Sequence, residues 1–311
     1  MLGGCALLWA ADPAAADEGG VSFWLSGSIA SFAATPTDPG WVMPGVYYHA
    51  GLDADVSKSF VTAGNLVLGL DADVDLVFLS PTYTFERKVA GGQAAVSVGW
   101  GYGHQSVEAS VVLTAPSGGA ISGRRADSVS GGSDLYPLGT LKWSSGNHSW
   151  MAYAQGGIPV GAYQVGRLAN LGLNHAALDG GGGYTYLDMS KGRELSVVAG
   201  FTYNFENRDT DYRNGTDGHV DWAASWFLSE RTHVGVAGYA YYQLSGDSGA
   251  GAVLGANEAR VYAIGPQWGR FFPLGKQQGY WGLRGYTEFG GRNRPEGWSA
   301  WLTLSLPLAQ Q

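Results

Sequence analysis

The chain of 311 residues carries a formal net charge of −8 and only 14% charged residues, with 50 glycines, 12 tryptophans and 17 tyrosines. Its 18 basic residues are scattered, which argues against a nucleic-acid partner because neutralising phosphates takes clustered Lys and Arg. No apolar run approaches the ~20 residues of a membrane-spanning helix, so any membrane form must pair its backbone between strands. The single cysteine excludes an internal disulfide. No shift in composition divides the chain, which predicts one domain.

The N-terminus begins with a short apolar run over residues 2–11, followed by small residues at 13–16. This order is typical of the end of a secretory signal peptide. We therefore predict that residues 1–16 are a signal-peptide remnant and that the mature chain starts near Asp17. Residues 17–40 are rich in small and turn-forming residues. They are expected to form an N-terminal extension, either in the periplasm or folded inward as a plug.

Alternating apolar and polar residues characterise the chain beyond this extension. The last run, Trp298–Leu308, alternates without a break and places Leu302 and Leu304 on one face and Thr303 on the other. One apolar and one polar face suit a strand between lipid and a wet lumen. The same period gives about twelve strand candidates: 41–56, 65–86, 92–114, 134–144, 147–158, 182–190, 194–206, 216–229, 231–245, 258–272, 278–291 and 297–308.

These candidates predict an all-β fold over residues 41–311, a single transmembrane antiparallel β-barrel of 12 strands. The abundant glycine and aromatic residues suit tight turns and the aromatic girdles of such barrels. The stretches 115–133, 159–181 and 246–257 are long and rich in Gly or Ala, so they are expected to be outer loops. A barrel of this size has an interior that side chains nearly fill, which predicts a narrow conduit.

The second strand candidate, 65–86, has two unusual features. Asp71, Asp73 and Asp75 alternate with apolar residues and resemble the opening of a calcium loop, but the glycine and final glutamate of that loop are missing. We expect an acidic stripe facing the lumen instead of a metal site. Ser80-Pro81 interrupts the run, which predicts a bulge that shifts the alternation by one residue.

One polar run resembles a known family. Its residues are Asn204, Asn207, Thr210, Tyr212, Gly215, Asp217, His219 and Asp221. The run is similar to one in the outer-membrane family named for the meta-pathway of phenol degradation, although Asp217 stands where the family has Glu. The resemblance implies a twelve-stranded outer-membrane channel thought to pass small hydrophobic or aromatic molecules.

Two pairs of polar residues are candidates for the lumen face of two neighbouring strands. His219 and Asp221 are two residues apart and therefore share a face. Asn204 and Glu206 are expected to lie beside them on the preceding strand. Such a cluster could bind cargo or a cation, or it could stiffen the wall through hydrogen bonds between buried groups.

Arg284 and Glu288 form a further candidate constriction, because residues four apart on a strand face the same side. From the lumen, Arg284 could pair with carboxylates of other strands, including Glu194 or Asp221. Such pairs would either select solutes or only support the wall.

Two functional classes remain open from the sequence. The first is passive uptake of small apolar or aromatic solutes through a monomeric channel in the bacterial outer membrane, surrounded by lipid and lipopolysaccharide. The second is an outer-membrane enzyme, a lipid hydrolase or protease, which needs a Ser, a His and an acid or amide. His219 and His233 are available for it, but no serine lies in a convincing motif. A structural barrel is a further alternative. We expect a channel that needs no metal, cofactor or nucleic acid.

Overall fold

The computed structural model describes residues 18, 22–114, 120–275 and 277–308. The predicted signal-peptide remnant, residues 1–16, lies outside them. Among the described residues, no helix is long and apolar enough to span a membrane.

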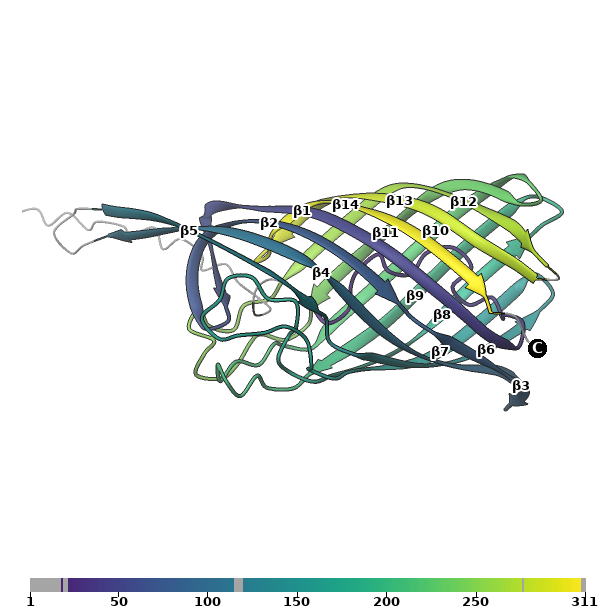
Figure 1. Ribbon diagram of the computed structural model, residues 1–311, viewed down its shortest axis with the longest axis horizontal. Helices are drawn as coiled ribbons and strands as arrows, with labels where there is room; N and C mark the ends of the chain where they lie inside the picture. Colours follow the sequence, from purple (N-terminus) through teal and green to yellow (C-terminus); the bar gives the residue numbers. More distant parts are fainter. Residues whose placement is uncertain (1–17, 19–21, 115–119, 276, 309–311) are drawn as a thin grey trace, which may run out of the picture.

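One antiparallel sheet closes on itself to form a barrel (Figure 1). Closure comes from β1 and the last strand, β14, which pair from Val42 with Pro307 to Asp53 with Glu296. The described part of the chain contains fourteen strand segments: β1 (Gly40–Thr62), β2 (Asn65–Leu79), β3 (Thr82–Val89), β4 (Gly92–Thr114), β5 (Ala120–Gly132), β6 (Tyr136–Ser145), β7 (His148–Gly157), β8 (Ala177–Asp188), β9 (Arg193–Asn204), β10 (Asp217–Ser229), β11 (Thr232–Gln243), β12 (Arg260–Leu274), β13 (Gln277–Arg292) and β14 (Glu296–Pro307).

The fourteen described segments make twelve wall strands because two of these strands are interrupted. β2 and β3 both pair with β1 and β4, and they are separated by Ser80-Pro81. Proline has no N–H to donate to the ladder, so the strand breaks there. β5 and β6 both pair with β4 in the same way. The predicted twelve-stranded barrel is confirmed, and the predicted bulge at Ser80-Pro81 is a break in the strand.

The prediction that 115–133 is an outer loop is wrong. Ala120–Gly132 pairs with β4 residue by residue from Tyr102 to Thr114. Together they form a hairpin that projects beyond the barrel (Figure 1). Its many small and polar residues weaken the alternation that reveals a strand in sequence.

The two ends of the barrel differ in the length of their connections. The loop end carries the connections at 158–176, 205–216, 244–259 and 293–295, whereas the turn end carries short turns such as 146–147 and 230–231. β1 begins and β14 ends at the turn end (Figure 1). Short periplasmic turns and longer external loops are the rule for bacterial barrels, which directs the loop end outward.

The outer face of the last strand is apolar, as predicted. Leu302 and Leu304 are 41% and 42% exposed, whereas the adjacent Trp301 is 3% exposed and Ser299 is 7% exposed. Alternate residues of a strand point to opposite faces. The leucines therefore face lipid, and Trp301 and Ser299 face the lumen.

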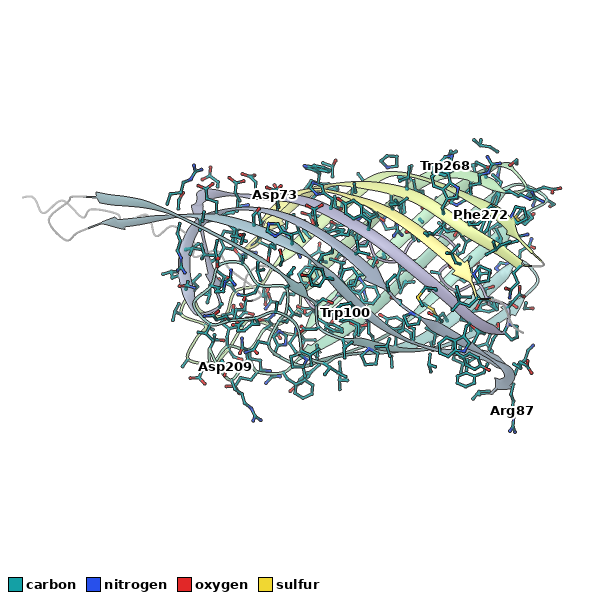
Figure 2. All side chains as sticks on the ribbon, in the orientation of Figure 1. Asp73, Arg87, Trp100, Asp209, Trp268 and Phe272 are labelled. Carbon is teal, nitrogen blue, oxygen red and sulfur yellow. The ribbon has the colours of Figure 1, made fainter. Side chains whose placement is uncertain are left out.

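The prediction for the acidic stripe of β2 is wrong in direction. Asp71 and Asp73 are exposed on the outer side, whereas Leu70 and Ala72 are buried and pack inward with Leu168 of the loop 158–176. Figure 2 labels Asp73 toward the loop end, the end that also carries Asp209, whereas Arg87 and Phe272 lie toward the turn end.

The same outer face of β2 becomes apolar closer to the turn end. Val77 and Leu79 are 51% and 44% exposed there. A face that changes from carboxylates to aliphatic side chains marks the level at which the strand leaves the membrane. β2 extends beyond that level, so its outer carboxylates meet water and its inner face needs apolar packing.

Candidate functional site in the barrel lumen

Residues 22–39, here called the N-terminal segment, run through the lumen toward the turn end, and Figure 1 shows their purple trace between the strands. The order of contacts gives the direction. Trp24 contacts His219 near the start of β10, and Phe32 contacts Phe227 near its end. The segment then leads into β1 at the turn end.

Two wall carboxylates hold the backbone of the N-terminal segment. Asp221 accepts hydrogen bonds from the amides of Gly27 at 3.1 Å and Ile29 at 3.2 Å. Glu194 accepts one from the amide of Phe32 at 3.0 Å and one from the Ser31 hydroxyl at 2.7 Å. Both carboxylates are buried. Hydrogen bonds to an ionised acceptor are stronger than those between neutral groups, so these two carboxylates hold the backbone of the segment in place.

Trp24 rests on a polar platform in the wall. Its indole stacks on the imidazole of His219, with ring centroids 3.8 Å apart and planes 12° from parallel. The His219 Nε2 lies 3.0 Å from Asp179 Oδ2, which also accepts the Thr202 hydroxyl at 2.5 Å. Trp24 belongs to a buried apolar cluster with Tyr153. The imidazole of His219 is therefore fixed twice, by stacking against Trp24 and by its polar contact with Asp179.

The residue at the loop end of the same stretch, Glu18, is held by loop residues. Its carboxylate accepts hydrogen bonds from Asn207 Nδ2 at 2.7 Å, the Thr210 hydroxyl at 3.2 Å and the Tyr163 hydroxyl at 3.4 Å. Its amide donates to Asn214 Oδ1 at 3.1 Å. Burial raises the pKa of the Glu18 carboxyl above its ordinary value, against the opposing effect of these hydrogen bonds.

Several residues of the run that resembles the known family thus bind Glu18 and the N-terminal segment. Asn207 and Thr210 hold Glu18. His219 carries Trp24, and Asp221 binds the backbone beyond it.

The remaining residues of the run brace the loop that follows β9. Asn204 Nδ2 donates to Asp217 Oδ2 at 2.8 Å, and the Tyr212 hydroxyl donates to Asp247 Oδ2 at 2.5 Å. Gly215 is required by a close approach, because a Cβ there would lie 1.6 Å from the carbonyl oxygen of Ser245.

The placement of Glu206 in the lumen is wrong. β9 ends at Asn204, and Glu206 lies beyond it with an exposed side chain. The alternation that put Asn204 and Glu206 on one face holds only while the strand continues.

Arg284 and Glu288 face the lumen, but with partners other than those predicted. Arg284 Nη2 donates to the carbonyl of Ser28 at 3.3 Å, and its guanidinium lies 5.3 Å from the centre of the Trp301 ring. Glu288 accepts the Tyr239 hydroxyl at 2.7 Å and the amide of Gly297 at 3.0 Å. The N-terminal segment takes the carboxylates of Glu194 and Asp221 that Arg284 was expected to meet. Sequence patterning could not show this, because it does not trace the segment.

The turn end adds residues that the sequence analysis missed. Lys142 Nζ donates to the carbonyl of Thr35 at 3.2 Å. It lines a cavity of about 170 Å³ with Thr37 of the segment and Thr84 and Thr140 of the wall. The Thr37 and Thr84 hydroxyls lie 3.0 Å apart and hydrogen-bond to each other, so the segment is also tied to the wall on this side.

Aromatic side chains line the part of the wall formed by β11, β13 and β14. Tyr239, Tyr241, Tyr286 and Trp301 are buried in one cluster with Ala30 of the segment. The Tyr286 hydroxyl also donates to the carbonyl of Gly27 at 3.3 Å. The lumen therefore offers ring faces together with a few polar anchors.

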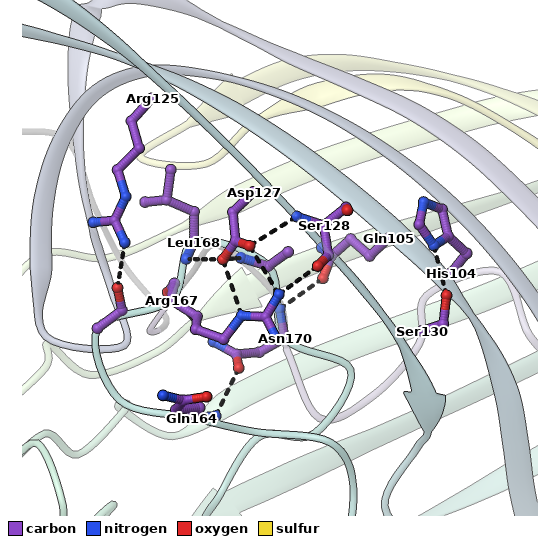
Figure 3. A network of polar contacts seen from close by, with 12 residues as sticks. His104, Gln105, Arg125, Asp127, Ser128, Ser130, Gln164, Arg167, Leu168 and Asn170 are labelled. Carbon is purple, nitrogen blue, oxygen red and sulfur yellow. Dashed lines mark hydrogen bonds and ion pairs between the residues drawn. The ribbon is translucent and has the colours of Figure 1, made fainter.

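One polar network holds the loop 158–176 at the loop end (Figure 3). Arg167 Nη2 and Nε donate to the two carboxylate oxygens of Asp127 at 2.8 and 3.1 Å, and the amide of Asn170 donates to Gln105 Oε1 at 3.0 Å. These bonds tie the loop to the projecting hairpin. In the described part of the chain, no three acidic, His or Cys side chains are grouped as a metal site requires.

Comparison with known proteins extends the description. The family model described as MetA-pathway of phenol degradation matches residues 57–304. An outer-membrane channel from Pseudomonas putida F1 has a similar structure, with a TM-score of 0.69 at 15% identity over 90% of this chain and 100% of that chain.

Two further barrels are more distant. A FadL homologue from Pseudomonas aeruginosa gives a TM-score of 0.46 at 9% identity, covering 96% of this chain and 99% of its own. The translocator domain of the autotransporter NalP from Neisseria meningitidis gives 0.42 at 11% identity, covering 88% and 91%. No curated protein sequence matches. The match over residues 57–304, on a closed barrel with an apolar outer face, makes this chain an outer-membrane member of the family described as MetA-pathway of phenol degradation.

Proposed function

We propose that the chain is a channel for passive uptake of small hydrophobic or aromatic molecules across the bacterial outer membrane. The aromatic lining of the lumen, formed by Tyr239, Tyr241, Tyr286 and Trp301, carries the proposal. A neutral ring gains offset or edge contacts with such side chains. A sugar would leave several hydroxyl groups without partners there, which disfavours its entry.

In this proposal residues 17–40 act as a plug, and the wall residues that hold the segment set the bore. Its described part is bound by His219 and Asp221, and Arg284 contacts its backbone. Glu288 supports the wall through Tyr239. A solute passes where the segment leaves space or moves aside.

The proposal places the protein in the membrane as a monomer. β1 pairs with β14, so the barrel is complete without a second chain. Leu302 and Leu304 meet lipid, and the carboxylates Asp71 and Asp73 lie at the level of the lipopolysaccharide headgroups outside the apolar band.

The hydrolase alternative has one contact in its favour. His233 Nδ1 lies 3.1 Å from Ser225 Oγ inside the barrel. However, His233 Nε2 faces the Tyr280 hydroxyl at 3.2 Å, where a triad needs a carboxylate or amide to orient the imidazole. Ser225 and His233 are both buried, and Ser225 also meets Gln267 Nε2 at 2.9 Å. We therefore propose a non-enzymatic channel.

Uptake by Gram-negative cells tests the proposal. Cells producing the chain should take up dilute phenol faster than cells producing the assembly-defective variant Leu304→Arg, and xylose should enter both at the same rate. Equal acceleration of xylose would indicate a general porin. Fatty-acid release from lipid by the purified chain, lost in Ser225→Ala, would instead favour the hydrolase.

A further inference from the structure

The Phe32 ring of the N-terminal segment is surrounded by rings of the barrel wall. Its centroid lies 6.0 Å from that of Phe227, 5.1 Å from His233, 5.5 Å from Phe271 and 6.5 Å from Tyr280. The contacts with His233, Phe271 and Tyr280 are edge-on, an arrangement that aromatic quadrupoles favour. These four wall residues, here called the aromatic cage, come from β10, β11, β12 and β13.

The backbone at Phe32 is held in an unfavourable conformation. Its φ is +67°, in the left-handed region that bulky residues rarely adopt. Such a conformation costs on the order of 1–3 kcal/mol and persists only when the surroundings enforce it. The cage on the ring and Glu194 on the amide provide that enforcement. The strain also weakens the hold of the cage on Phe32 relative to that on an unstrained ring.

Two features make the aromatic cage suitable for a separate small molecule. His233 Nε2 and the Tyr280 hydroxyl lie 3.2 Å apart at the cage wall and offer a hydrogen-bonding partner for a phenolic hydroxyl. Phe227 also lines a broad hollow at the turn-end rim, formed by residues 189–192 and 227–230. The cage therefore combines ring faces, a polar contact and a wall shared with the outside of the barrel.

We propose that the aromatic cage is a binding site for one monocyclic aromatic ring bearing a hydroxyl, and that Phe32 is a built-in ligand which the solute displaces. The inference rests on the proposed channel function and specifies its substrate class. Because Phe32 and the solute compete for one site, solute binding favours the conformation in which this part of the segment has left the cage.

Phenol binding to the purified full chain in detergent tests the site. Phe32→Gly removes the competing ring and permits the positive φ without strain. If Phe32 fills the cage about nine-tenths of the time, this variant should bind phenol about tenfold more tightly than the wild type. Phe201→Gly, which removes a lipid-facing ring of β9 that is 63% exposed, is the matched control and should bind like the wild type.

Selectivity and location are tested in the same assay. Cyclohexanol matches phenol in size and hydroxyl but lacks the aromatic ring, so it should gain much less from Phe32→Gly. Adding Phe271→Ala to Phe32→Gly should abolish the gain for phenol. If Phe32→Gly does not assemble, Phe32→Ala replaces it with the same expectation.

The inference is overturned if Phe32→Gly binds phenol no more tightly than the wild type, or if Phe201→Gly or cyclohexanol shows the same gain. Binding in detergent does not depend on transport. Wild-type phenol uptake without a binding gain in Phe32→Gly would therefore refute the cage and leave the channel standing. A binding gain without uptake would refute the channel function and leave the binding site.

Discussion

The indole of Trp24 lies nearly parallel to the imidazole of His219, with 3.8 Å between ring centroids. This contact joins the N-terminal segment to the third residue of β10. His219 is itself held by Asp179 at 3.0 Å. The polar pair that the sequence offered for solute is therefore occupied by the chain itself, His219 by Trp24 and Asp221 by the amides of Gly27 and Ile29.

Trp24→Ala should loosen the N-terminal segment and raise single-channel conductance. An aromatic pair contributes about 0.5–1.5 kcal/mol beyond the area it buries, so its loss shifts the segment toward released states. Trp226→Ala, on the outer face of the same strand, is the control and should keep the wild-type conductance. Identical currents from all three proteins would show that the segment does not limit flow.

Asp221→Asn should also open the channel. Hydrogen bonds to charged groups contribute about 1.5–3 kcal/mol, and the neutral amide accepts the Gly27 and Ile29 amides more weakly. Loss of the carboxylate should also move the reversal potential toward anions, and Arg284→Ala should move it toward cations. Glu206→Gln changes an exposed residue outside the lumen and should alter neither quantity. An effect of Glu206→Gln equal to that of Asp221→Asn would contradict this account of the lumen.

Leu304→Arg should impair assembly much more than Thr303→Arg. Leu304 faces lipid, where an arginine near the midplane costs about 2–4 kcal/mol, whereas Thr303 points toward the lumen side. Unfolding by urea in phospholipid vesicles measures the difference. If both variants are equally stable, the assignment of faces in β14 is wrong.

Low pH should strengthen the docking of Glu18. Burial raises the pKa of this carboxyl above its ordinary value of 4.5, so the docked state binds the proton more tightly than the released state. Docking is then fully favoured below pH 4.5 and weakens as the pH rises through the raised pKa. Burial raises the pKa of the neighbouring Tyr163 hydroxyl further above its ordinary value, so this group stays protonated throughout the same window.

The comparison with Glu18→Gln isolates that effect. Open probability of the wild type should rise from pH 4 to pH 7 by more than that of Glu18→Gln, whose side chain stays neutral. The same pH dependence in both proteins would exclude Glu18 as its origin.

Local periodicity predicted the wall because each strand alternates between two fixed environments. It succeeded for β14, where Leu302 and Leu304 meet lipid. It failed for the part of β2 that extends past the membrane. There the polar face points outward into water, as Asp71 does, and not into the lumen.

The lumen was predicted less completely, since its contacts join residues distant in sequence. The pattern identified His219, Asp221, Arg284 and Glu288 as inward-facing, but it did not show the N-terminal segment, which contacts the first three of them. No local signal links Phe32 to its ring contacts on four strands. The one available clue was Phe23-Trp24-Leu25 in the extension, because three apolar side chains need a buried surface.

Entry of phenol and xylose into asymmetric vesicles with an outer leaflet of lipopolysaccharide tests the channel function most directly, because that leaflet slows the unassisted passage of apolar solutes. The full chain should raise the phenol rate above that of protein-free vesicles, and Asp221→Asn should raise it further, while xylose remains near the protein-free rate. Phenol entry that stays at the protein-free rate, or xylose entry that rises as much as phenol entry, would contradict the account.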